Sequence, residues 1–197
     1  DFPTLYSGWG LRHSTTFNVL SVKLNGQTEQ YRFEKQSNGM RVYIGKPNVI
    51  LSPGVYTYEI RYRTERQIGY FDDFDEFYWN ATGDQWDFVI ERAKAVVELP
   101  PGAYMVYQDA FTGQRGAKGQ DFMIGADTQG NVTFAAAGPL PPGEGMTIAI
   151  AWPKGIVAEP SRGQKVAWML RDNRNVLFGL AGLLFVLAYG LCRVFIR

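Results

Sequence analysis

The sequence has almost none of the residues on which most metal and nucleophile sites depend. Its 197 residues include one cysteine, Cys192, and one histidine, His13. A lone cysteine excludes an intrachain disulfide framework and a cysteine-ligated zinc site. His13 precedes Ser14, but adjacent side chains of an extended chain diverge, and the sequence has no Gly-x-Ser-x-Gly elbow. We therefore expect no catalytic residues, no resident metal and no cofactor.

An excess of charge of either sign is also missing. The chain carries 20 Lys and Arg against 19 Asp and Glu, for a formal net charge of +1. Binding to a phosphate backbone needs a basic excess gathered on one face, so we expect no nucleic-acid partner. The composition, 46% hydrophobic and 20% charged, is that of a folded chain and excludes disorder. The length suits one domain with an appendage.

A long apolar run is present only near the C-terminus. Residues 176–192 (VLFGLAGLLFVLAYGLC) contain no charge, with Arg174 before them and Arg193 after them. A spanning helix needs about 20 mostly apolar residues, and flanking arginines can reach the headgroups. We expect a single transmembrane helix over residues 174–197, preceded by a linker and juxtamembrane segment over residues 154–173. A buried core helix is the alternative, but no second helix of similar apolarity exists to cover it.

The rest of the chain has the alternation of β-strands. Large and small residues alternate over 146–152, and apolar and polar residues alternate over 56–62. Further candidate strands lie at 17–24, 31–33, 40–44, 88–99 and 131–137. The 17–24 segment changes phase between Val19 and Leu20, which predicts a bulge. Turn signals such as Pro-Pro-Gly separate these strands, and no βαβ alternation occurs. We therefore predict an all-β fold, an antiparallel β-sandwich over residues 1–153.

An acidic and aromatic motif lies in the middle of this region. Its six carboxylates within sixteen residues belong to Asp72, Asp73, Asp75, Glu76, Asp84 and Asp87. Calcium takes six to eight oxygen ligands of this kind, but the spacing does not match an EF-hand loop. We therefore interpret residues 71–87 as a solvated turn anchored by its aromatic side chains, and leave calcium as the alternative.

The same motif supplies the candidate binding residues. Asp75 and Glu76 would point to opposite faces of a strand, which argues against the paired carboxylates of a glycosidase. Trp86 could stack on a sugar ring or a peptide, although most aromatic residues of a small sandwich belong to the core. The predicted binding residues are Asp72, Asp73, Asp75, Glu76 and Trp86.

Two segments resemble a known family. The string QIGYFDDFDEFYWNATGDQW at residues 67–86 resembles the central motif of the predicted membrane protein family called domain of unknown function 2207 (DUF2207). The string LPPGEGMTIAIAWPKG at residues 140–155 resembles the last strand of that family's N-terminal domain. The resemblance implies a signal peptide before residue 1, a β-domain outside the cytoplasm, the helix, and further segments after it. It implies no established catalytic residues.

Two functional hypotheses remain. The first is a membrane-anchored extracytoplasmic binding or scaffolding module of the bacterial envelope, which contacts membrane lipid through its helix and a protein partner through the 71–87 motif. The second is an accessory subunit of a larger membrane complex, whose helix packs against partner helices. Both predict a location in the cell membrane, and neither involves catalysis.

Overall fold

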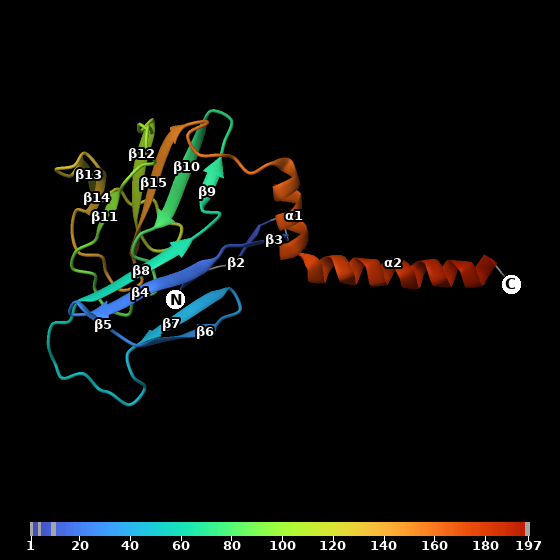
Figure 1. Ribbon diagram of the computed structural model, residues 1–197, viewed down its shortest axis with the longest axis horizontal. Helices are drawn as coiled ribbons and strands as arrows, with labels where there is room; N and C mark the ends of the chain where they lie inside the picture. Colours follow the sequence, from blue (N-terminus) through green and yellow to red (C-terminus); the bar gives the residue numbers. More distant parts are fainter. Residues whose placement is uncertain (1, 4, 9–10, 196–197) are drawn as a thin grey trace. The chain divides into compact units, whose positions relative to one another are not determined.

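The computed structural model describes residues 2–3, 5–8 and 11–195, with side chains over residues 11–189 (Figure 1). The chain forms two compact units. Unit 1 comprises residues 1–66 and 160–197, and unit 2 comprises residues 67–159. These bounds differ from the single domain predicted over residues 1–153, whose independent folding stays a prediction.

Unit 1 contains three small antiparallel sheets. Their strand orders are β1-β7-β6, β2-β3 and β5-β4-β8. The strands are β1 (Phe2–Pro3), β2 (Leu5–Gly8), β3 (Leu11–Ser14), β4 (Phe17–Leu24), β5 (Gln27–Thr28), β6 (Tyr31–Lys35), β7 (Gly39–Ile44) and β8 (Tyr58–Thr64). The β6–β7 hairpin confirms the prediction for residues 31–33 and 40–44. The bulge is confirmed as well, because the β4–β8 register shifts between Val19 and Ser21.

Unit 2 contains a four-stranded and a three-stranded antiparallel sheet. Their strand orders are β12-β15-β10-β9 and β11-β14-β13. The strands are β9 (Ile68–Tyr70), β10 (Phe74–Asn80), β11 (Lys94–Val97), β12 (Tyr107–Gly113), β13 (Phe122–Ala126), β14 (Val132–Ala136) and β15 (Gly145–Pro153). The predicted strands at 131–137 and 146–152 are confirmed. The strand predicted at 88–99 is shorter and covers only β11, with an isolated bridge from Ile90 to Leu140.

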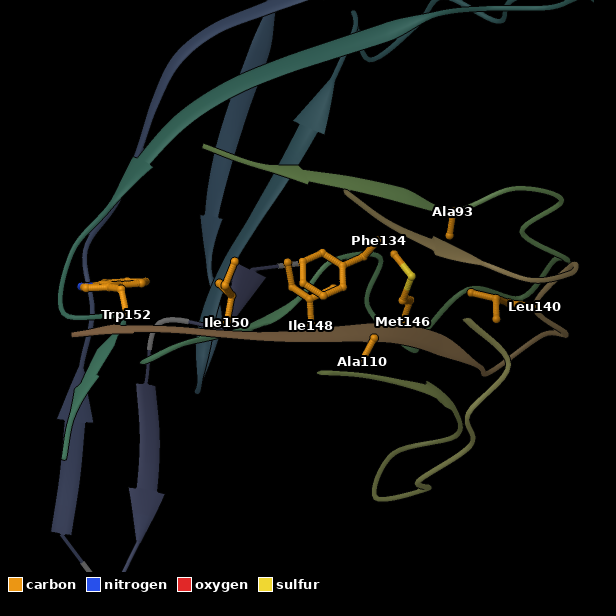
Figure 2. Packing of buried hydrophobic residues seen from close by; sticks show 8 residues of the cluster. All are labelled: Ala93, Ala110, Phe134, Leu140, Met146, Ile148, Ile150 and Trp152. Atoms are coloured by element: carbon orange, nitrogen blue, oxygen red, sulfur yellow. The ribbon is translucent and has the colours of Figure 1, made fainter. Parts of the chain in front are cut away.

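The two sheets of unit 2 share one apolar core. Met146, Ile148, Ile150 and Trp152 project from one side of β15, and the Phe134 ring of β14 lies beside Ile148 (Figure 2). Each of these five side chains is at most 3% exposed. This side of the four-stranded sheet is called the inner face below, and the opposite side the outer face. The antiparallel all-β character predicted for this part of the chain is thus confirmed.

Residues 74–80 correct the prediction of a turn. They form β10, which pairs with β15 from Phe74 opposite Pro153 to Asn80 opposite Thr147. Phe77 and Trp79 pack against the core, as expected for the aromatic anchors of the motif. The alternation of this strand is hidden in the sequence because its acids and its aromatic residues occur on both faces.

Unit 1 ends in two helices, α1 (Arg162–Asp172) and α2 (Arg174–Phe195). Helix α1 lies within the predicted linker and juxtamembrane segment, residues 154–173. Ser161 and Gln164 form a reciprocal capping box that starts α1, because each side chain bonds the other residue's backbone N–H.

Side chains at the end of α1 attach it to β3. Asn173 Oδ1 accepts a hydrogen bond from Arg12 N at 2.8 Å, and Asn173 Nδ2 donates to Arg12 O at 3.1 Å. Asp172 accepts from Ser14 N and forms an ion pair with Arg66 at 2.8 Å. The Arg66 guanidinium also lies 4.6 Å from the ring centroid of Trp168. The start of α2 is thus fixed to the β-structure of unit 1.

Helix α2 covers most of the segment predicted to cross the membrane. Its described side chains are exposed from Val176 to Tyr189 on every side of the helix. Across the described residues, no helix combines enough length with enough apolarity to cross a membrane, so the predicted crossing is not shown.

Candidate functional site

The outer face of the four-stranded sheet has a floor of small residues. Ala149 and Ala151 of the central strand β15 point to this face. They alternate in sequence with Ile148, Ile150 and Trp152, which point inward. Both alanines are at most 3% exposed. They are buried although they lie on the face away from the core, because larger side chains of the neighbouring strands rise around them.

Two neighbouring strands supply the walls around this floor. Glu76 and Tyr107 lie opposite Ala151, from β10 and β12 respectively. One step along, Tyr78 and Asp109 lie opposite Ala149 in the same way. Large side chains of β10 and β12 therefore flank the two alanines of β15.

A hollow of about 560 Å³ lies at the Pro153 end of β15. Its lining combines carboxylate, phenol and apolar side chains. The lining residues are Asp73, Phe74, Glu76, Tyr104, Val106, Tyr107 and Pro153. Tyr104 is 66% exposed and Tyr107 46% exposed, so both rings are accessible to a ligand. This group of seven residues is called the outer hollow below.

The outer hollow is electrostatically negative. The Tyr107 hydroxyl donates a hydrogen bond to Asp109 Oδ2 at 3.0 Å. This bond, partial burial and the negative charges of Asp109 and Glu76 raise the pKa of Tyr107 above its ordinary value. None of the outward-pointing residues of β10, β12 and β15 is Lys or Arg. A ligand of positive charge would therefore be favoured here.

Asp75 lies on the inner face, away from the outer hollow. It is fully buried opposite Trp152, and its Oδ1 accepts a hydrogen bond from Lys154 Nζ at 2.9 Å. Lys154 also pairs with Glu159 at 3.2 Å. The hydrogen bond to Asp75 is the main reason that the pKa of Lys154 is raised, with Glu159 adding to it and burial working against it. Asp75 therefore holds the segment after β15 and cannot belong to an exposed binding surface.

The other predicted site residues are dispersed. Asp73 and Glu76 line the outer hollow, and Asp72 is exposed in the turn just before β10. Trp86 lies at the opposite end of the sheet. Its carbonyl oxygen accepts a hydrogen bond from Gly143 N, just before β15 begins. Asp75, in contrast, lies opposite Trp152 near the end of β15.

The aromatic residue Trp86 is only partly available to a ligand. Its indole Nε1 donates to Thr82 O at 2.7 Å, and its ring is 5.2 Å from that of Phe88. The side chain remains 45% exposed. Over the described part of the chain, no three His, Cys, Asp or Glu side chains are grouped so that they could hold a metal ion.

Sequence reasoning missed the β12 half of the site. Tyr107, Asp109 and Phe111 alternate with Gln108 and Ala110, and this period of two was a usable signal for a strand with an exposed aromatic face. Tyr104 carried no such signal, because it precedes the strand and reaches the hollow only through the course of its loop.

Comparison with known proteins bears on these residues. The N-terminal domain of a predicted membrane protein, DUF2207, matches residues 4–152. The chain belongs to the DUF2207 family. The match includes every residue of the outer hollow except Pro153, whereas Lys154, α1 and α2 lie beyond it.

A curated relative of this DUF2207 chain is the uncharacterized protein YciQ of Escherichia coli (strain K12). It is 23% identical over 155 residues, which cover 75% of this chain and 23% of YciQ. The chain thus spans less than a quarter of the length of that relative. No solved structure matches this DUF2207 chain.

Proposed function

We propose that this protein is a membrane-anchored recognition module that binds a protein partner through the outer hollow and performs no catalysis. The observation that carries the proposal is the hollow itself, in which exposed Tyr104 and Tyr107 line one surface together with Asp73 and Glu76. Rigid aromatic rings supply contact area at little cost in conformational entropy, and carboxylates select the charge and orientation of the partner.

Three features support a membrane anchor. Residues 176–192 carry no charge, the described apolar side chains of α2 are exposed all round the helix, and the family is described as a predicted membrane protein. A helix that is apolar on every side is stable only when lipid or other protein covers it. We propose that α2 lies in the bilayer and that the β-structure lies outside the cytoplasm, as the family resemblance implies.

The composition of the hollow supports recognition without chemistry. Its lining has no Ser, Thr, Cys, His or Lys, so no Ser–His or Cys–His pair can form in it. Its two carboxylates, Asp73 and Glu76, could in principle act as acid and base, but no third group orients either of them within the described residues. The proposed role therefore depends on shape and charge alone.

Partner purification tests this function. The full chain would be purified from native membranes in mild detergent, and co-purifying proteins would be identified by mass spectrometry. A double variant, Glu76→Gln with Tyr104→Ser, should release the partner. The matched control is Glu98→Gln with Tyr58→Ser, which changes two exposed residues outside the hollow. A partner retained by the first variant would contradict recognition through the hollow.

The same purification distinguishes the accessory-subunit alternative. If α2 packs against partner helices, large substitutions at Gly179 and Gly182 should release the partner, because a side chain added at either position points into open space on the helix surface. Under the favoured proposal these substitutions leave the partner bound. Protease added to spheroplasts should digest the β-structure, and protection of the β-structure would reverse the proposed orientation.

A further inference from the structure

We infer that the outer hollow binds the guanidinium group of an arginine side chain presented by the partner protein. The inference rests on the proposed function and adds the chemical class of the ligand. Three properties of the lining carry it: uncompensated negative charge, hydrogen-bond acceptors without charged donors, and exposed aromatic rings.

Some acids of the chain have a cation beside them, which the carboxylates of the hollow lack. Asp75 pairs with Lys154, Asp84 with Arg115, and Glu59 with Lys23. Within the described residues, no ion pair engages Asp73 or Glu76. Two unpaired carboxylates that line one hollow repel each other, and a bound cation offsets that repulsion.

The polar atoms of the lining are mostly acceptors. Both carboxylates accept only, and the Tyr107 hydroxyl proton is already directed to Asp109, which leaves the phenol oxygen free to accept. Guanidinium is the complementary group, because it has five N–H donors and no acceptor. A phosphate, a carboxylate or a sulfate would meet repulsion at the same atoms.

Exposed rings favour a planar cation over a compact one. Guanidinium stacks on aromatic faces, whereas an ammonium is more strongly hydrated and has no planar face. The molecule uses this contact elsewhere: the Arg32 guanidinium lies 3.8 Å from the ring centroid of Tyr43, and that of Arg66 lies 4.6 Å from Trp168. Tyr104 and Tyr107 offer the same kind of surface, and within the described part of the chain no arginine stacks on either ring.

The apolar part of the lining favours a side chain of a protein over a free amine. Phe74, Val106 and Pro153 give the hollow an apolar portion beside its carboxylates. An arginine side chain has a three-carbon stem that such a surface can cover while its head reaches the acids. A polyamine has charges along its whole length and would place some of them against the apolar lining.

Titration with short peptides tests the inference directly. The probe is acetyl-Gly-Ala-Arg-Ala-Gly-amide, added to the full chain in detergent with ¹³C-labelled tyrosine rings and followed by NMR. The arginine peptide should shift the Tyr104 and Tyr107 signals. The citrulline peptide, which has the same shape without the charge, should bind at least about tenfold more weakly. Equal binding of the two peptides would overturn the inference.

Variants and competing cations give the test its specificity. Glu76→Gln should weaken binding of the arginine peptide about fivefold, and Asp73→Asn should weaken it similarly. Glu98→Gln should leave the binding unchanged. If spermidine or the matched lysine peptide bound more tightly than the arginine peptide, the choice of arginine as the ligand would be overturned. Peptide binding that leaves the tyrosine signals unmoved would overturn the choice of site.

The outcome is separable from that of the purification experiment. If the hollow variants release the co-purifying partner but the arginine peptide does not bind, the ligand class is wrong and the recognition function stands. If the arginine peptide binds but the same variants retain the partner, the hollow is an arginine site and the proposed function fails.

Discussion

Asp75 and Glu76 are neighbours on β10, and they lie in opposite environments on the two faces of one sheet. Asp75 is fully buried beside Trp152 and is ion-paired with Lys154. Glu76 faces outward into a solvent-open hollow with no cation beside it. Because side chains alternate along a strand, consecutive residues face opposite sides of the sheet. Asp75 therefore forms a structural ion pair, whereas Glu76 is a candidate binding group. An acidic motif read as one surface is therefore divided between the two faces of the sheet.

The largest expected difference between the faces concerns packing. Phe134→Ala removes a fully buried ring from the inner core and should lower the free energy of unfolding by about 3 to 5 kcal/mol. Tyr78→Ala removes a ring that is 56% exposed on the outer face and should cost about 1 kcal/mol or less. Denaturant titration of the full chain, followed by tryptophan fluorescence, measures both values. Similar losses of unfolding free energy for the two variants would mean that the outer face is itself packed. The outer face would then not be an exposed recognition surface.

Part of this division could be predicted from the sequence. The alternation of large and small residues over 146–152 showed both faces of β15, because Ile and Trp alternate there with Ala. The opposite orientations of Asp75 and Glu76 also followed from the period of a strand. The burial of Asp75 did not follow, because its partner Lys154 is 79 residues away in sequence and the pairing depends on the β10–β15 register.

Other errors have the same origin. Tyr107 joins the outer hollow through the pairing of β12 with β15, a pairing that no local pattern indicates. The attachment of α1 depends on Arg66 and Asp172, which are 106 residues apart. Local periodicity thus predicted several strands, such as β4, β8 and β15, but missed β10 and β12. It could not predict long-range polar pairs, since these pairs require knowledge of strand order.

A smaller effect tests the inner ion pair. Lys154→Met leaves the Asp75 carboxylate buried without a cation, and we expect it to destabilise the chain more than Asp75→Asn does. Asp75→Asn should cost about 1 kcal/mol, because the amide oxygen can still accept from Lys154, whose side chain is 31% exposed and can also reach water and Glu159.

The double variant Asp75→Leu with Lys154→Met provides the control for that comparison. It removes both charges at once and should recover much of the stability lost in Lys154→Met, because no charge is left buried and unpaired. Denaturant titrations of the three variants give the order of their free energies of unfolding. If Asp75→Asn proved to be the most damaging of the three, a second donor to Asp75 would have to exist.

The smallest expected effect concerns the pKa of Tyr107 on the outer face. The hydrogen bond to Asp109 and the charge of Glu76 raise the pKa of Tyr107, so the neutral phenol is favoured in the folded protein. This contribution to stability is present below the ordinary tyrosine pKa of about 10 and is lost as the pH rises through the raised value. Asp109→Asn should therefore lower the Tyr107 pKa towards its ordinary value, and Glu76→Gln should lower it by less. Ring-carbon NMR of Tyr107 across an alkaline titration measures both shifts, with Glu98→Gln as the control that should leave the pKa unchanged. A Tyr107 pKa insensitive to Glu76 would mean that the negative field attributed to the outer hollow does not reach its aromatic wall.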